Sequence, residues 1–246
     1  MTSLFGQAVK TTRYATVLLV MVLAACGREN TGANAPAASA PPLAQVYTAS
    51  DYANVVQGLY ISYFGRPADT GGLQNFQTQL MTLNIPADIG QLDQQYHGNA
   101  AFKTLIDSFS ISPESAALYS GDNTAFITAI FKNVLNRKPN PEGLAFWIKA
   151  LDSGSVTRSN AALAIMAAAL TNTTEQGKAD KAVLNNKIKI GNNFTEALLN
   201  APADGYAGKA AAAKARTMLA SVDASTDATA FQGTVNKLVS DLAPAK

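Results

Sequence analysis

Apolar residues recur at spacings of three and four from Ser50 to Ala245, and no stretch keeps a regular alternation of apolar and polar residues. Spacings of three and four are typical of amphipathic helices, whereas alternation would indicate strands. The two clearest stripes are Val55-Val56-Leu59-Tyr60-Tyr63 and Phe126-Ile127-Ile130-Phe131-Val134-Leu135. The pattern therefore predicts an all-α fold.

The two stripes align with each other without a gap at an offset of 71 residues, and the alignment continues beyond both. The matched positions include Val56 with Ile127, Leu59 with Ile130, Tyr60 with Phe131, Phe64 with Leu135, Arg66 with Arg137, Asp69 with Asn140, Gly72 with Gly143, Phe76 with Trp147, and Leu80 with Leu151. Such a register predicts a helical array built from a duplicated helix-turn-helix unit, about 50–83 and 121–154.

In each unit, one helix is expected to end at a residue that tolerates the left-handed conformation, and the next to begin at a short acceptor side chain. These are Gly65 and Asn136 at the C-terminal ends, and Asp69 and Asn140 at the N-caps. Gly72 and Gly143 would let the second helix pack closely against its partner. Ser112-Pro113-Glu114 predicts another helix start, with Pro in the first turn.

Further stripes predict helices at the C-terminal end of the chain. They are Leu184-Ile188-Phe194-Leu198, Met218-Leu219-Val222 and Phe231-Val235-Leu238-Val239. We expect these helices to join the two units in a single α-helical domain over residues 48–245.

The N-terminal residues 1–25 have the pattern of a secretory signal. Lys10 and Arg13 precede an apolar run that starts at Ala15 and is too short for a transmembrane helix. The run ends in Leu23-Ala24-Ala25-Cys26-Gly27, which resembles the lipobox of bacterial lipoproteins, although an ordinary signal with a chance cysteine would give the same letters. The resemblance implies cleavage before Cys26, acylation of Cys26, and anchoring of the protein in the outer membrane.

Residues 26–47 are rich in Ala, Pro, Asn and Ser, which predicts a disordered tether between the lipid and the domain. The chain has 19 Lys and Arg against 17 Asp and Glu, and two of the basic residues lie in the signal. The remainder is balanced, so the excess of clustered cations that nucleic-acid binding needs is missing. One cysteine excludes an intrachain disulfide, and one histidine excludes a zinc site with several His ligands.

The residues around the first turn, Leu59-Tyr60-x3-Phe64-Gly65-Arg66-Pro67-Ala68-Asp69-x2-Gly72-Leu73-x2-Phe76, resemble the bacterial family called domain of unknown function 4214. The second copy, from Phe131 through Asn136-Arg137-Lys138-Pro139-Asn140-Pro141-Glu142-Gly143-Leu144 to Trp147, is similar. With its flanks the resemblance covers about residues 48–200. It implies an all-helical module of secreted, cell-surface and S-layer-associated proteins, with no known activity.

The candidate binding residues each have a structural alternative. Arg66 and Arg137 could contact an anion or a sugar, or bond to helix-end carbonyls and to a neighbouring acid such as Asp69. Asp69 and Asn140 suit caps better than a catalyst or calcium ligand, because the charge is not kept in both units. Trp147 could stack on a sugar or pack in the core. The stretch Gln94–Asn99, with Tyr96 and His97, could be a binding loop, or simply a loop or helix end.

No motif of a nucleotide-binding loop, calcium loop or serine hydrolase occurs, so we expect a protein that is not an enzyme and has no cofactor or metal. The first hypothesis is a lipid-anchored module of the bacterial outer envelope that binds a surface polysaccharide, such as lipopolysaccharide, or an S-layer or secreted protein. A scaffolding lipoprotein of a secretion or adhesion system is the alternative. A polysaccharide-modifying enzyme is a third reading, which requires two carboxylates in one pocket.

Overall fold

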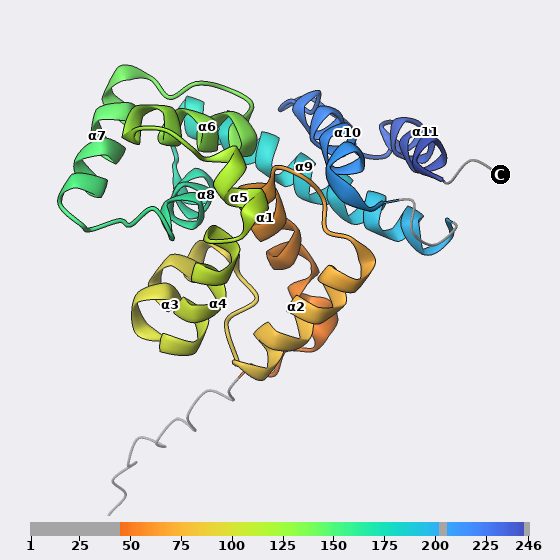
Figure 1. Cartoon of the computed structure of the whole chain (residues 1–246), viewed down its shortest axis with the longest axis horizontal. Coiled ribbons are helices and arrows are strands. Elements are labelled where there is room, and N and C mark those ends of the chain that lie inside the picture. Colours follow the sequence, from red (N-terminus) through yellow and green to blue (C-terminus); the bar gives the residue numbers. More distant parts are fainter. Residues whose placement is uncertain (1–44, 202–205, 244–246) are drawn as a thin grey trace, which may run out of the picture. The chain divides into compact units, whose positions relative to one another are not determined.

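The computed structural model describes residues 45–201 and 206–243 (Figure 1). All regular elements in these ranges are helices, which confirms the all-α class. Two short 3-10 helices, η1 (Ala49–Tyr52) and η2 (Ile89–Gln91), accompany the α-helices. The α-helices are α1 (Ala53–Phe64), α2 (Thr70–Thr82), α3 (Leu92–Gly98), α4 (Ala100–Ser110), α5 (Pro113–Leu118), α6 (Asn123–Leu135), α7 (Pro141–Asp152), α8 (Ala161–Thr171), α9 (Glu175–Leu199), α10 (Gly208–Ala220) and α11 (Gln232–Leu242).

Helix α1 is buried along nearly its whole length, because α2, α6, α8 and α9 all pack against it. Its buried face includes the polar Gln57, whose amide nitrogen donates to the Gly191 carbonyl at 3.2 Å and to the Thr195 hydroxyl at 2.7 Å. A buried amide without such partners would be costly. Gly191 makes the contact possible, since a Cβ there would lie 2.8 Å from the Gln57 Oε1 atom.

The C-terminal helices pack on α9, the longest helix in the described part of the chain. Figure 1 shows α10 and α11 on the same side of α9, away from α3, α4 and α7. The sequence prediction of helices in this region is confirmed. Helix α8, which is rich in alanine, is buried on nearly all sides and contacts α9, η2 and α3.

The connections α1–α2 and α6–α7 have the local geometry that the sequence predicts. Gly65 and Asn136 adopt the left-handed conformation, with φ of 64° and 56°. The Asp69 and Asn140 side chains then accept hydrogen bonds from the Gly72 and Gly143 nitrogens at 2.7 and 2.9 Å. The predicted caps are therefore confirmed, while the duplication of the whole unit stays a prediction.

The two cap-proximal glycines differ in what surrounds them. At Gly72 an added Cβ would lie 1.9 Å from the Tyr60 hydroxyl, which confirms that this glycine lets α2 approach α1 closely. The same expectation is wrong for Gly143, where the nearest atom is Oδ1 of Asn140 at 2.6 Å and the partner helix lies beyond 4 Å. Gly143 leaves room for its own cap rather than for a neighbouring helix.

The polar stretch Gln94–Asn99 is not a loop. Most of it lies in α3, and Asn99 caps α4 by accepting a hydrogen bond from the Phe102 nitrogen at 3.0 Å. The prediction that this stretch forms a loop is therefore wrong. Within the two described ranges, each helix is too short or too polar to cross a bilayer.

Candidate functional site

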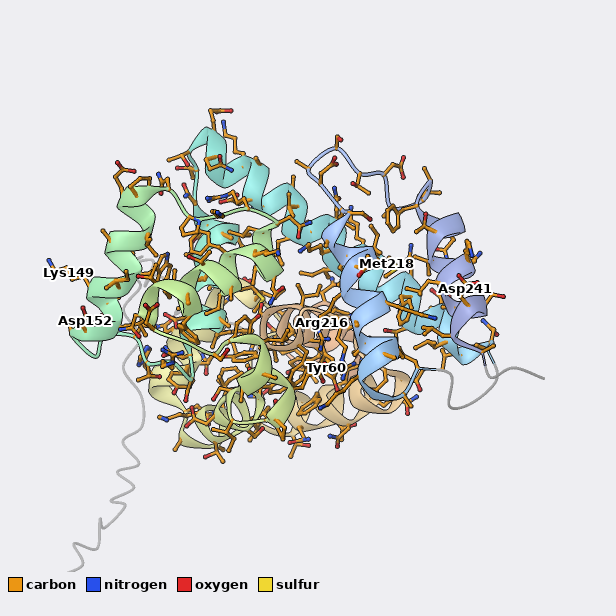
Figure 2. The ribbon with its side chains drawn as sticks, turned by 45° about the horizontal axis from the view of Figure 1, so that its top comes forward. Tyr60, Lys149, Asp152, Arg216, Met218 and Asp241 are labelled. Atoms are coloured by element: carbon orange, nitrogen blue, oxygen red, sulfur yellow. The ribbon has the colours of Figure 1, made fainter. Side chains whose placement is uncertain are left out.

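A cleft of about 780 Å³ lies between the α1–α2 connection, the α4–α5 segment and α10. Its volume falls within the roughly 300–1,000 Å³ that is typical of ligand pockets, and it exceeds the cavity of about 280 Å³ beside Tyr63 and Arg158. Figure 2 shows two of its residues, Arg216 on α10 and Tyr60 on α1, facing the same region. The walls combine aromatic rings with charged side chains.

The charged part of the cleft is a carboxylate between two arginines. Arg66 binds Glu114 through two parallel hydrogen bonds, from Nε to Oε1 at 2.8 Å and from Nη2 to Oε2 at 3.0 Å. The Nη2 atom of Arg216 donates to the same Oε1 atom. Two-point arginine–carboxylate pairs are geometrically specific and stronger than single ion pairs. The cluster keeps one net positive charge.

Aromatic rings surround the Arg66 guanidinium. Its central carbon lies 5.4 Å from the ring centres of both Tyr60 and Tyr206, within cation–π range. Burial opposes the charge of Arg66, but hydrogen bonds to Glu114 and Tyr206 outweigh it and raise the Arg66 pKa. Burial also raises the pKa of Tyr206 to about 12, so its hydroxyl remains protonated and donates to the Pro67 carbonyl at 2.9 Å.

Helix α10 supplies the far wall of the cleft. Lys209, Ala212 and Arg216 are spaced three and four residues apart and line the cleft, while Ala211 and Ala215 belong to the hydrophobic core. The Nε atom of Arg216 donates to the Phe64 carbonyl at 2.7 Å, at the C-terminal end of α1. Arg216 therefore joins α10 to both α1 and Glu114.

The second connection holds its arginine in the same way but at another place. Arg137 donates to Asp180 from Nε at 2.7 Å and from Nη2 at 2.5 Å, and to the Lys138 carbonyl at 3.0 Å. Arg66 makes the equivalent bond to the Pro67 carbonyl at 3.1 Å. Asp180 is nearly buried in α9, and neither Arg137 nor Asp180 lines the cleft.

The other predicted residues of the two connections have mainly structural contacts. Asp69 caps α2 and lies 3.8 Å from Arg66, between Oδ2 and Nη1, and Asn140 caps the exposed start of α7. Trp147 is partly buried against the core and packs on the exposed Phe146, with ring centres 5.1 Å apart. Arg66 and Asp69 are thus close to each other, whereas Arg137 pairs with Asp180, and neither Arg137 nor Asn140 lines the cleft.

Tyr96 and His97 lie on α3 and contribute to neither pair. Tyr96 is buried and its hydroxyl donates to Oδ1 of Asp107 at 2.8 Å, whereas His97 is exposed. Cys26 lies outside the described residues. Across the described residues, His, Cys, Asp and Glu side chains do not gather in groups of three or more that could hold a metal ion.

The sequence reasoning missed most of the residues that form the cleft. The sequence indicates Glu114 only as part of a helix start, and it gives no sign of a role for Tyr206, Lys209 or Arg216. Pairings of Arg66 with Glu114 and of Arg216 with Glu114 span 48 and 102 residues, so no local spacing indicates them. The one available signal was Arg66 itself, a cation beside a predicted helix end.

Residues 106–173 match the family model described as domain of unknown function (DUF4214). This segment contains α5 with Glu114 and the second connection with Arg137 and Asn140. The first connection and α10 lie outside it, so Arg66, Lys209 and Arg216 reach the cleft from beyond the matched segment. Neither a curated protein nor a solved structure matches the chain.

Proposed function

We propose that this protein is a non-enzymatic binding module of the bacterial outer envelope, anchored by lipid at Cys26, that holds a surface polysaccharide in the cleft beside Arg66. The lipobox-like sequence supports the anchor. Two or three acyl chains would hold the protein firmly, since each buried methylene contributes about 0.8 kcal/mol. The domain would then present its cleft to glycans at the membrane surface.

The observation that carries this proposal is the composition of the cleft. Partly exposed Phe76 and Tyr206 offer apolar faces of the kind on which a sugar ring stacks, and Arg66, Lys209 and Arg216 offer hydrogen-bond donors. Sites of this kind use apolar walls for affinity and a few polar groups for orientation. Tyr60 also lines the cleft, and its hydroxyl has no hydrogen-bond partner in the part of the chain that the structure describes.

The cleft favours binding over glycoside hydrolysis. Hydrolysis of a glycosidic bond needs two carboxyl groups roughly 5–10 Å apart, one of them able to give up a proton. Glu114 is the single acid among the described residues that line the cleft, and both its oxygens are engaged by arginines. This arrangement supports a module that holds its ligand without reacting with it.

A second candidate is a scaffolding lipoprotein that contacts an S-layer or secreted protein through α7. Phe146 is 62% exposed there, next to the partly buried Trp147. Exposed aromatic side chains are common in protein–protein contacts. The cleft supports the first candidate more strongly than Phe146 supports the second, because three helical segments and a charged cluster form it.

The test is retention of the purified full-length protein, in detergent, on immobilised glycans from the envelope of its own host. Binding to at least one polysaccharide fraction is expected, with competition by the same glycan in solution. No retention on any fraction, together with one stoichiometric protein partner after crosslinking in cells, would replace the proposal with the scaffolding alternative. A crosslinked partner lost on Phe146→Ser would place that contact on α7.

A further inference from the structure

We infer that the cleft selects an acidic polysaccharide, one whose sugar rings carry carboxylates or other anionic groups, and that Lys209 and Arg216 on α10 bind the anionic group. This inference rests on the proposed function and names the class of glycan. It follows from the balance of charge in the cleft, from the unused donors on α10 and from the position of the helix start.

Among the described residues that line the cleft, cations outnumber acids. Arg66, Lys209 and Arg216 line it, and Glu114 is the opposing charge. When Asp69, which lies 3.8 Å from Arg66, is counted as well, these described residues still carry an excess of one positive charge. Outside the signal, the basic and acidic residues of the chain are equal in number. The positive excess at the cleft is therefore a local feature and does not reflect the charge of the whole protein.

Arg216 keeps hydrogen-bond donors that its protein contacts do not use. Its Nε atom donates to the Phe64 carbonyl and its Nη2 atom to Glu114, while Nη1 has no partner among the described residues. The side chain as a whole is 23% exposed. A guanidinium edge of this kind matches the geometry of a carboxylate.

Lys209 brings a second, more exposed cation to the same wall. It lies seven residues before Arg216 on α10, about 10 Å along the helix axis, with the small Ala212 between the two. Lys209 makes no ion pair within the described part of the chain. The two cations therefore border a shallow stretch of wall that can accept a ligand group without displacing a large side chain.

The start of α10 adds to the positive potential. Gly208 lines the cleft with a φ of 79°, and Ala207 before it has no side chain that can cap the helix. The N-terminal end of a helix carries a partial positive charge and favours anions. Aromatic walls next to these groups suit a ring that is apolar on one face and charged at its edge, which describes an acidic sugar better than a lipid headgroup.

The direct test is calorimetric titration of the full-length protein in detergent with trigalacturonic acid and with its neutral methyl ester. We expect the acid to bind about tenfold or more tightly than the ester, since hydrogen bonds between charged groups are roughly twice as strong as neutral ones. Binding of the acid should weaken as salt is added, because exposed charges are screened.

Two lysines of α10 give a matched pair of variants. Lys209 and Lys214 are both exposed on the same helix, but Lys209 lines the cleft and Lys214 does not. Lys209→Gln is expected to weaken binding of trigalacturonic acid about two- to fivefold, whereas Lys214→Gln should bind like the unmodified protein. Equal melting temperatures of the two variants would show that the fold is intact in both.

Several outcomes overturn the inference. In the titrations, these are no binding of trigalacturonic acid, or equal affinity for the acid and its ester. In the variants, they are an equal loss of affinity, or no loss, in both Lys209→Gln and Lys214→Gln. Binding to phosphatidylglycerol vesicles that is stronger than binding to the acid and depends on Lys209 would also overturn it. If host glycans are still retained in these cases, the proposed function stands and only the charge preference falls. If host glycans are not retained either, the proposed function fails as well.

Discussion

Lys187 is a single residue whose surroundings oppose its charge. It lies on α9 and is 1% exposed, and its ammonium group donates to the Asn133 carbonyl at 2.6 Å and to Oδ1 of Asn136 at 2.7 Å. Burial lowers the pKa of Lys187 to about 7, because the charged form loses its hydration. Both acceptors lie at the C-terminal end of α6, where a cation is favoured. Lys187 therefore links α9 to α6, and the loss of hydration of its charged form lowers the stability of the folded protein.

Stability should consequently rise with pH in a range set by Lys187. The folded protein releases this proton near pH 7, whereas the unfolded chain keeps it until the ordinary lysine pKa of 10.5. Between these values the unfolded state binds more protons, so the free energy of unfolding increases with pH. Each pKa unit corresponds to about 1.4 kcal/mol, which predicts a gain of a few kcal/mol. Urea unfolding across this range measures it.

Lys187→Met provides the comparison. Methionine fills a similar volume but does not titrate, so the variant should lack the part of the pH dependence that Lys187 supplies. Its absolute stability is less informative, since it also loses the bonds to Asn133 and Asn136. Parallel curves of unfolding free energy against pH for the two proteins would contradict a depressed pKa at Lys187.

At the scale of elements, the adjacent glycines Gly71 and Gly72 test how closely α2 packs on α1. A Cβ at Gly72 would lie 1.9 Å from the Tyr60 hydroxyl, whereas at Gly71 the nearest atom is 3.7 Å away. Gly72→Ala should lower the free energy of unfolding by about 1–3 kcal/mol, because the buried Tyr60 ring or α2 itself must shift. Gly71→Ala should leave it unchanged or raise it by up to about 1 kcal/mol through helix propensity. Chemical unfolding of both variants measures the difference, and equal effects would contradict the close approach.

The cap of α7 gives a second prediction at this scale. Asn140 accepts a hydrogen bond from the Gly143 nitrogen at 2.9 Å, and its side chain is otherwise exposed. Asn140→Ala should cost about 1 kcal/mol of stability. Asn140→Asp should retain the stability, because the carboxylate can accept the same bond and the first connection already uses Asp69 in this way. A melting temperature that falls equally in both variants would argue against the cap as the cause.

Helix ends were predictable from the sequence because their interactions are local. Asp69 reaches Gly72 and Asn140 reaches Gly143, three residues on, so the residue types alone indicate the bond. Tyr96 was harder to place, since the polar stretch around it suggests a loop, while in the structure α3 packs against α4 and α8 and the Tyr96 hydroxyl donates to Asp107 on α4. Apolar spacing identifies a helix, but it does not say which polar residues the neighbouring helices will cover.

At the scale of the whole molecule, the cleft exists because segments distant in the chain converge on one place. Arg66 follows α1, Glu114 begins α5, and Arg216 lies on α10. A single sequence carries no sign of such a convergence, because each pairing depends on how α10 docks against the first connection. The second connection has the same local residues but pairs Arg137 with Asp180, so equivalent sequence positions do not produce equivalent sites.

The proposed attachment of the protein to the membrane concerns the whole chain, and replacing Cys26 by Ser tests it. We expect the unmodified protein to incorporate labelled palmitate and to sediment with membranes. Cys26→Ser should remain an unprocessed precursor without label, since the thiol that receives the lipid is gone. Cys26 is the one cysteine of the chain, so no other thiol can substitute for it.

Gly27→Ala is the matched control for Cys26→Ser, because it changes the neighbouring residue and keeps the thiol. It should be labelled and processed like the unmodified protein. Labelling of Cys26→Ser would refute the lipid anchor. Anchoring and binding can be tested separately, because the described residues that line the cleft lie between Tyr60 and Arg216, distant from Cys26 in the sequence. A Cys26→Ser protein that still binds envelope glycans would therefore keep its ligand specificity while losing its place at the membrane.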